Sequence, residues 1–246
     1  MPQHVRSKWR KTCALMGSDS LRRIIPQTVR YKRSELEKML NRFGMVYVKP
    51  DVGTHGIGVM RVERRRMRYR LQHDRRLRSF ASFSAMAVAL ERGMRGKRYL
   101  IQRGIRLLKH EGRVFDLRVM VQLNPSRRWQ TTGLIGRVAA PRKIVTNYHS
   151  GGRLLSVGRL LSGRMGKAAV PSQIRKLEKL GERAGRAMHK RFTGVREVGV
   201  DVGLDRSLTP WIIEVNTRPD PYIFRKLSNP AVFRTIRRYA RAYGRL

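Results

Sequence analysis

The spacing of apolar residues predicts four helices along the chain. In residues 32–43 an apolar stripe indicates an amphipathic helix with Ser34 as its cap. Residues 82–93 predict a short helix that ends at Gly93, and a basic helix covers about 230–243. The longest helix opens at Pro171, and one of its faces is formed by Ile174, Leu177, Gly181, Ala184 and Met188.

Short apolar runs bounded by turns predict strands between these helices. They cover residues 45–49, 57–63, 98–105, 114–123, 129–139, 197–204 and 211–216. The stretch 148–170 contains five glycines and predicts a mobile loop region. Because the strands occur in antiparallel-looking sets interrupted by helices, the order indicates an α+β fold rather than an alternating Rossmann pattern.

Charge changes this picture more than any other feature of the composition. Lys and Arg number 56, and Asp and Glu number 16, which gives a formal net charge of +40. Such a field attracts polyanions, so unspecific polyanion binding at low salt is expected. If "RRMRYRLQ" is a strand, one of its faces holds Arg64, Arg66, Arg68 and Arg70. This face is either a polyanion-binding surface or simply a solvated face of an arginine-rich chain.

Length and composition exclude several classes of protein. The chain has 246 residues, of which 41% are hydrophobic, so one large domain or two small ones can form a core. No apolar run approaches the roughly 20 residues that span a membrane, and the start lacks the apolar region of a secretory signal. The single cysteine, Cys13, cannot form an internal disulfide, so a reduced, cytoplasmic setting is expected.

A glycine-rich turn preceded by a lysine is the first candidate for chemistry. In "VYVKPDVGTHGIGVMRVE", residues 46–63, Lys49 ends a strand and Gly53, Gly56 and Gly58 follow. Bare backbone lets N–H groups approach a phosphate closely, and a lysine adds a point charge. The stretch lacks the G-K-[ST] ending of a Walker A motif and the K-x-D-G of nucleotidyl-transferring ligases. It predicts a hairpin whose tip folds over phosphates, or else a purely structural hairpin.

Acidic residues are scarce, so those in apolar strands carry more information. Glu214 and Asn216 are two residues apart and share a strand face, while Asp201 lies in the preceding strand. Two carboxylates and a carboxamide are hard oxygen ligands that suit Mg²⁺, which also binds phosphate oxygens. The alternative is a hairpin with solvent-facing acids. In "FDLRVMVQ", Asp116 and Arg118 also share a strand face. The arginine could clamp a phosphate, or the two residues could simply form a salt bridge.

These three motifs, in this order, resemble the ATP-grasp superfamily. The resemblance covers nearly the whole chain and is nearest to the YheC/YheD-type branch, described as endospore coat-associated; glutathione-synthetase-like ligases are a more distant match. Its most specific part is "DVGLD…WIIEVNTRPDP". The family implies a nucleotide between two α+β lobes. The expected division is an amino-terminal segment 1–25 packing on the larger lobe, a smaller lobe 26–97 with the glycine hairpin, and a larger lobe 98–246 with the metal site.

The resemblance also implies roles for individual residues. The implied ATP-binding residues are Lys8, Lys49, Gly53, Gly56, Gly58, Gln102, Asp116 and Asn147. Lys8 is implied by "SKWRKTCALMGSDSLRRIIPQT", where a lysine precedes a "P-x-T" turn, and Gln102 by the strand "YLIQRGI". Arg118 and Arg137 are implied as catalytic arginines, and Asp201, Glu214 and Asn216 as the Mg²⁺ ligands.

The implied activity is ATP- and Mg²⁺-dependent ligation of a carboxylate to an amine through an acylphosphate. The arginine surplus would attract an acidic substrate, which is a small molecule, a peptide or a polymer. Only 25 residues precede Pro26, fewer than a substrate-binding domain needs. The alternative is therefore a non-catalytic ATP-grasp module that binds polyanions or spore-coat proteins at the forming coat. A nucleic-acid-binding function rests on charge alone, since aromatic residues make up 7% of the chain.

Overall fold

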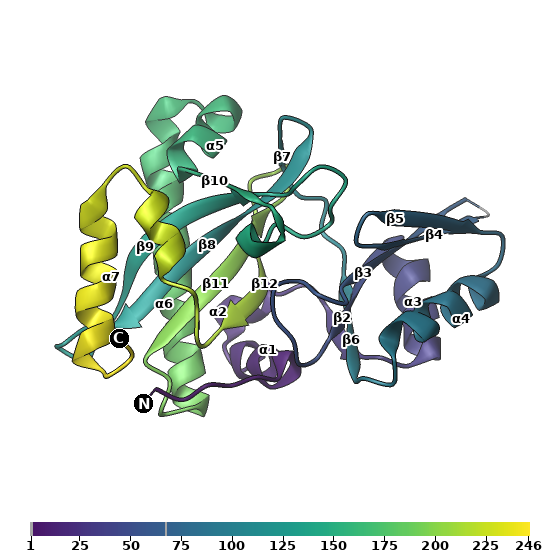
Figure 1. Cartoon of the computed structure of the whole chain (residues 1–246), viewed down its shortest axis with the longest axis horizontal. Helices are drawn as coiled ribbons and strands as arrows, with labels where there is room; N and C mark the ends of the chain where they lie inside the picture. Colours follow the sequence, from purple (N-terminus) through teal and green to yellow (C-terminus); the bar gives the residue numbers. More distant parts are fainter. Residues whose placement is uncertain (1, 67) are drawn as a thin grey trace.

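Two antiparallel sheets organise the chain into two lobes (Figure 1). The computed structural model describes residues 2–66 and 68–246. In the smaller lobe the strand order across the sheet is β1-β6-β2-β3-β4-β5. These strands are β1 (Thr28–Arg30), β2 (Met45–Pro50), β3 (Met60–Arg65), β4 (Arg68–His73), β5 (Arg76–Phe80) and β6 (Tyr99–Arg103). Because β6 pairs with β1 and β2, this sheet extends to Arg103, beyond the boundary expected between residues 97 and 98.

The core of the smaller lobe lies on one face of its sheet. Helices α3 (Arg33–Phe43) and α4 (Phe83–Met94) cover that face, and Val48 belongs to the same apolar cluster as Leu40. Successive residues of a strand point to opposite faces. Lys49, the next residue of β2, therefore points away from this core and toward the larger lobe.

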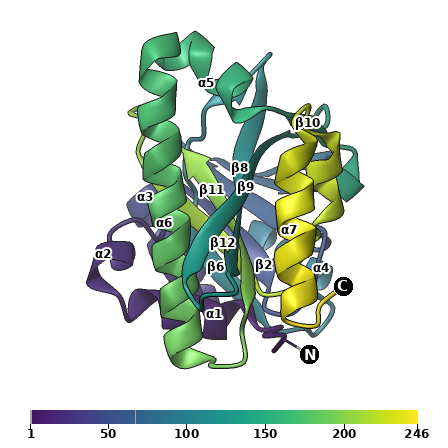
Figure 2. The same cartoon turned by 90° about the vertical axis from the view of Figure 1, so that its left-hand side faces the viewer.

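The larger lobe holds the second sheet, in the order β10-β9-β8-β11-β12, with β7 paired to β8. Its strands are β7 (Lys109–His110), β8 (Arg113–Leu123), β9 (Trp129–Val138), β10 (Arg153–Leu155), β11 (Glu197–Leu204) and β12 (Pro210–Asn216). Helix α6 (Val170–Arg191) covers one face and α7 (Pro230–Ala242) covers part of the other (Figure 2). Alternate residues of β8 thus pack differently: Val119 clusters with α6, whereas Met120 clusters with α7.

The amino-terminal segment packs on the larger lobe, close to the inter-lobe region. Its helices α1 (Lys8–Met16) and α2 (Asp19–Arg22) contact α6, and α1 also contacts β12 (Figure 1). None of the described helices has the length and apolar content needed to cross a membrane. The α+β prediction is confirmed by these two sheets and their helices.

The predicted arginine strand is wrong, because the chain reverses within it. Strand β3 ends at Arg65, β4 begins at Arg68, and these two residues are opposed in the sheet. Arg66 lies in the turn with a left-handed φ of 50°, and Met67 lies outside the described residues. The reversal puts Arg64 on the face of Val62 and Tyr69, and Arg68 and Arg70 on the opposite face; the four arginines therefore do not share one face.

Two other local predictions also need correction. Stretch 148–170 is structured rather than a mobile loop: it forms the short helix η1 (Tyr148–Ser150), β10, helix α5 (Val157–Met165) and the short helix η2 (Lys167–Ala169). Ser156 caps α5 by accepting a hydrogen bond from the Arg159 N–H. Helix α3 has Lys32 as its N-cap residue, so Ser34 lies inside the helix instead of capping it.

Candidate functional site

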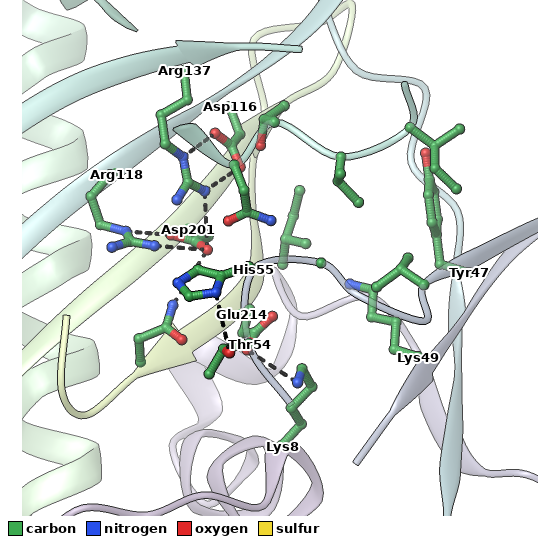
Figure 3. A pocket seen from close by; sticks show the side chains of 18 of the residues that line it. Lys8, Tyr47, Lys49, Thr54, His55, Asp116, Arg118, Arg137, Asp201 and Glu214 are labelled. Carbon is green, nitrogen blue, oxygen red and sulfur yellow. Dashed lines mark hydrogen bonds and ion pairs between the residues drawn. The ribbon is translucent and has the colours of Figure 1, made fainter. Parts of the chain in front are cut away.

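A cavity of 230 Å³ lies between the two lobes (Figure 3). Its lining comes from β2 and β6, the glycine-rich loop that joins β2 to β3, the larger sheet, and residues 144–149. Gly58 is the one predicted site residue that does not line it. The structure brings the others to this cavity: Lys8, Lys49, Gly53, Gly56, Gln102, Asp116, Arg118, Arg137, Asn147, Asp201, Glu214 and Asn216.

Strand register places the charged side chains of the larger lobe on one face. Asp116 of β8 is opposite Arg137 of β9. Asp201 of β11 is opposite Arg118 on one side and Glu214 of β12 on the other. Directly opposed residues of antiparallel strands have neighbouring side chains on the same face. The five side chains therefore form a charged floor across four strands.

Two buried arginine–aspartate pairs form the centre of this floor. Arg137 donates to Asp116 from Nε, at 2.8 Å, and from Nη2, at 2.6 Å. The same Nη2 lies 3.0 Å from Oδ2 of Asp201. Arg118 donates from Nε to Oδ1 of Asp201 at 2.6 Å and from Nη2 to Oδ2 at 3.3 Å. These bidentate contacts fix both guanidinium planes before any ligand is bound.

The contacts also fix the charge of the floor. Burial by itself raises the pKa of Asp201, but the charges of Arg118 and Arg137 outweigh it and lower the pKa to about 2. Burial lowers the pKa of Arg137, yet Asp116 and Asp201 act in the opposite direction and raise it above its ordinary value. Asp201 and Arg137 therefore both carry their charges at neutral pH.

Lys49 faces this floor from the smaller lobe. Its Nζ donates to Oε1 of Gln102 at 2.6 Å, and Nε2 of Gln102 donates to the carbonyl of Ile213 at 3.3 Å. Burial lowers the pKa of Lys49 to about 8; the charge of Glu214 opposes this effect and that of Lys8 adds to it. A phosphate beside this ammonium would favour its charged form and raise the pKa again.

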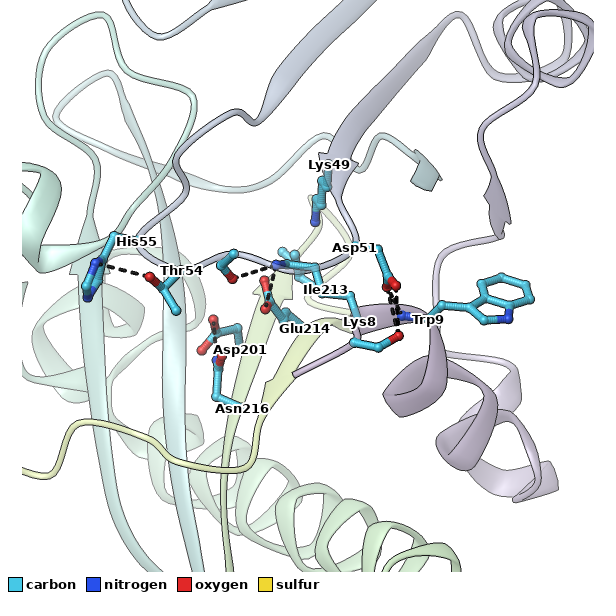
Figure 4. Close-up of polar contacts among 12 residues, drawn as sticks. Lys8, Trp9, Lys49, Asp51, Thr54, His55, Asp201, Ile213, Glu214 and Asn216 are labelled. Carbon is cyan, nitrogen blue, oxygen red and sulfur yellow. Dashed lines mark hydrogen bonds and ion pairs between the residues drawn. The ribbon is translucent and has the colours of Figure 1, made fainter. Parts of the chain in front are cut away.

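The amino-terminal segment supplies a second cation to the cavity. Lys8 Nζ donates to the carbonyl of Gly53 at 2.9 Å and lies 3.7 Å from Oε1 of Glu214 (Figure 4). The carboxylate of Asp51 anchors this segment by accepting from the Ser7 hydroxyl, at 2.9 Å, and from the Trp9 N–H, at 2.8 Å. Asp51 is not among the residues predicted from the sequence, where its place directly after Lys49-Pro50 is the available signal.

The glycine-rich loop rests on the larger lobe. The Ser150 hydroxyl donates to the carbonyl of His55 at 2.9 Å. The rings of His55 and His149 pack edge to face, with 4.8 Å between their centroids. Gly56 has a φ of +73°, and a Cβ there would lie 2.8 Å from Nδ2 of Asn147. Only glycine fits this close, left-handed position without strain.

Residues 142–150, here called the bridging segment, make further contacts between the lobes. Lys143 Nζ lies 2.9 Å from Oδ1 of Asp74, and Gln72 donates to the carbonyl of Arg142 at 2.7 Å. The His149 Nε2 is 3.2 Å from Asp220 within the larger lobe. No local sequence pattern predicts these contacts, because their partners are far apart along the chain.

Asp201, Glu214 and Asn216 carry oxygen donors of the kind that a magnesium ion shared with phosphates takes, although both Asp201 oxygens already accept hydrogen bonds from arginine. No group of three His, Cys, Asp or Glu side chains that could hold a metal occurs in the described part of the chain. Asp201 and Glu214 are opposed on adjacent strands, and Nδ2 of Asn216 donates to Asp201 at 3.4 Å. Mg²⁺ commonly takes one or two carboxylates and completes its shell with phosphate oxygens and water. This site offers that kind of incomplete, oxygen-only set.

The family model for YheC/D-like ATP-grasp proteins matches residues 2–246. The chain belongs to the YheC/D-like ATP-grasp family. This confirms the resemblance found in the sequence and assigns the two-lobed α+β architecture to the ATP-grasp fold.

Curated relatives within this ATP-grasp family come from Bacillus subtilis (strain 168). The chain is 24% identical over 195 residues to endospore coat-associated protein YheD, covering 77% of this chain and 42% of that protein. It is 20% identical over 217 residues to endospore coat-associated protein YheC, covering 86% of this chain and 59% of that protein. The chain thus spans about half the length of the curated relatives it matches.

A solved structure supports the ATP-grasp fold independently of close sequence similarity. The structure of D-cycloserine synthetase DcsG is similar with a TM-score of 0.59 and 12% sequence identity. The similarity covers 96% of this chain and 68% of that chain. At this identity the comparison establishes the fold alone, because one fold hosts many different chemistries.

Proposed function

We propose that the protein is an ATP- and Mg²⁺-dependent ligase that joins a carboxylate to an amine through an acylphosphate. The observation that carries the proposal is the Arg118–Asp201–Arg137–Asp116 network, which faces Lys49 and the glycine-rich loop across one cavity. Cations held in advance, where charge develops, stabilise phosphoryl transfer without reorganising during the reaction. The ATP-grasp fold of the chain supports the same class of reaction.

The proposed reaction has two steps. A carboxylate oxygen of the substrate attacks the γ-phosphorus of ATP, the bond to the bridging oxygen breaks, and ADP leaves with that electron pair. The amine then attacks the acylphosphate carbonyl, phosphate leaves, and the amine loses a proton to solvent. The first step turns a poor electrophile into one with a good leaving group, which explains the need for ATP.

Residue roles follow from position in the cavity. We assign Lys8, Lys49 and the N–H groups of the glycine-rich loop to the phosphates, and Gln102 to the adenine end. Arg118 and Arg137 stabilise the charge that builds on the transferred group. Asp201, Glu214 and Asn216 would hold Mg²⁺, which neutralises phosphate charge when bound.

An ADP-release assay tests this proposal. Purified protein with MgATP is offered a panel of acidic compounds, each with and without a panel of amines. We expect ADP release that needs one carboxylate and one amine together, and an Arg137→Lys variant that retains the charge but loses most of the activity, because lysine lacks the planar fork. The absence of paired dependence across the panel, with MgATP bound, would favour the alternative below.

The alternative is an ATP-grasp module that binds nucleotide without turning it over. It is favoured by one observation: both carboxylate oxygens of Asp201 accept hydrogen bonds from arginine, which leaves them less free for a metal. Such a module would bind polyanions or coat proteins, in line with the coat association in the names of its relatives. We infer a place at the forming spore coat, on the cytoplasmic side, under either function.

A further inference from the structure

A second hollow, of 840 Å³, lies between the lobes beside the nucleotide cavity. Tyr47, Ile105, Leu107 and Val114 line both spaces, so only a thin layer separates them. The smaller lobe contributes β3, β4 and β5, and the larger lobe contributes residues 105–109, the end of α5 and the β11–β12 turn. The β4–β5 hairpin and β7 stand on the same side of the molecule (Figure 1).

Basic side chains from both lobes line this hollow, here called the arginine groove. They are Arg61, Arg65, Arg70, Arg106, Lys109, Arg164 and Arg206. Glu63 is the single acidic residue of the described lining, and it is already held between Arg61 and Arg65 at 3.2 Å from each Nε. None of the ion pairs in the described part of the chain involves Arg70, Arg106 or Arg206. These three cations line the groove without a direct ion pair, although Arg70 lies opposite Glu63 in the sheet.

The net charge of +40 alone does not explain this arrangement. A basic surface lowers its self-repulsion by spreading charges over a convex, solvated face. In the arginine groove the charges converge from two lobes on a concave space, where repulsion is stronger. An acidic ligand in the groove would relieve that repulsion and hold the two lobes together.

The rest of the lining indicates which kind of acidic ligand fits. Aliphatic side chains lie between the basic residues, and Leu77 is 53% exposed there, whereas Ile105 and Leu108 are buried. The other apolar residues of the lining are Met45, Tyr47, Ile105, Leu107, Leu108, Val114 and Leu208. Tyr47 is the single aromatic ring in the described lining, whereas grooves for single-stranded nucleic acid interleave cations with several stacking rings. Aliphatic side chains flanked by carboxylates match this surface better than nucleobases or a bare polyphosphate.

We propose that the arginine groove docks an acidic peptide segment whose carboxylates alternate with aliphatic side chains. The carboxylates pair with Arg70, Arg106 and Arg206, and the aliphatic groups cover Leu77 and its neighbours. This goes beyond the proposed function, because docking in the groove needs neither nucleotide nor metal. It gives the protein a protein partner that is recognised outside the nucleotide cavity.

Fluorescence anisotropy with a labelled peptide of alternating Glu and Leu tests the proposal at physiological ionic strength. The groove variant changes Arg70, Arg106 and Arg206 to Glu. The matched control changes Arg234, Arg237 and Arg241 to Glu; these exposed residues lie on α7, and the net charge falls by the same amount. We expect about tenfold or greater weakening for the groove variant and less than about threefold for the control.

Two further probes decide the chemistry of the ligand. A peptide of alternating Glu and Ser should bind more weakly than the Glu–Leu peptide, and polyphosphate and oligothymidylate should compete poorly for the groove. Equal weakening in both charge variants would show that only the overall field matters and would overturn the proposal. So would equal binding of the Ser peptide, or a groove-dependent preference for polyphosphate or oligothymidylate.

The MgATP-induced rise in melting temperature, measured on the same proteins, separates this proposal from the proposed function. The groove variant should keep the shift, which shows that it is folded and that its nucleotide cavity is intact. No MgATP shift in the wild type, with groove-dependent peptide binding, would count against the ligase and leave the groove standing. If the triple variant does not fold, the single variant Arg206→Glu provides the test instead. Arg206 lies in an exposed turn, and its replacement should weaken peptide binding about threefold or more.

Discussion

Lys49 offers a sharp test of the nucleotide cavity, because its charge should depend on whether phosphates lie beside it. Burial, which the charge of Glu214 partly offsets, lowers the pKa of Lys49 from 10.5 to about 8. Bound phosphates favour the ammonium form and should return the pKa to its ordinary range. MgATP binding should therefore take up roughly half a proton per site at pH 8, roughly 0.9 at pH 9 and roughly 0.1 at pH 7.

Calorimetric titration with MgATP, in buffers of different ionisation enthalpy, measures this proton uptake. Lys49→Met should bind MgATP more weakly and show none of the pH-dependent uptake. Lys49→Arg should show none either, since arginine stays charged, while retaining part of the affinity. If uptake has the same size and pH dependence in wild type and Lys49→Arg, the proton belongs to another group and the assignment of Lys49 is wrong.

The same pKa links stability to pH in the free protein. Between about pH 8 and 10.5 the unfolded chain binds more protons at Lys49 than the folded protein does, so the free energy of unfolding rises with pH over that window. The full contribution is about 3 kcal/mol. Urea unfolding should show this rise in the wild type and a flatter profile in Lys49→Met.

Three other substitutions test separate parts of the site. Asp201→Asn should lower the free energy of unfolding by about 3–5 kcal/mol in urea titrations, because it leaves buried arginine charge unpaired; in the wild type the lowered pKa of Asp201 contributes about 2 kcal/mol, which is lost as pH falls from about 4 to about 2. Gly56→Ala should prevent the loop from resting on Asn147 and reduce the MgATP-induced melting shift, whereas Gly158→Ala, in open space on a helix, should not. Glu214→Gln should sharply lower ATP turnover while circular dichroism stays unchanged; full activity would refute its metal role.

The α+β fold and most element positions could be predicted because their signals are local. The two apolar runs that become β11 and β12 are joined by a short turn, so they predict neighbouring strands that contain Asp201 and Glu214. The apolar stripe of α6 predicts its buried face. The reversal at Arg66 was missed because arginine is not a typical turn residue, and the run of basic residues hid the break. Ser150 and His149 could not be found, since their contacts with His55 join segments about ninety residues apart, which no local pattern reveals.

The contacts of the bridging segment have a kinetic consequence. The inter-lobe cavity has 230 Å³, less than the roughly 300–1,000 Å³ of typical ligand pockets, so under the proposed function MgATP would enter after the lobes separate. Three contacts of the bridging segment oppose that separation, in addition to those of Gln102 with Ile213 and of Lys8 with Gly53: Ser150 to His55, Gln72 to Arg142, and Lys143 to Asp74. At about 1 kcal/mol each, these three contacts alone would lower the ratio of open to closed molecules roughly a hundredfold. Association of MgATP would then be about a hundredfold slower than it would be without them. The same three contacts would slow the release of an enclosed nucleotide.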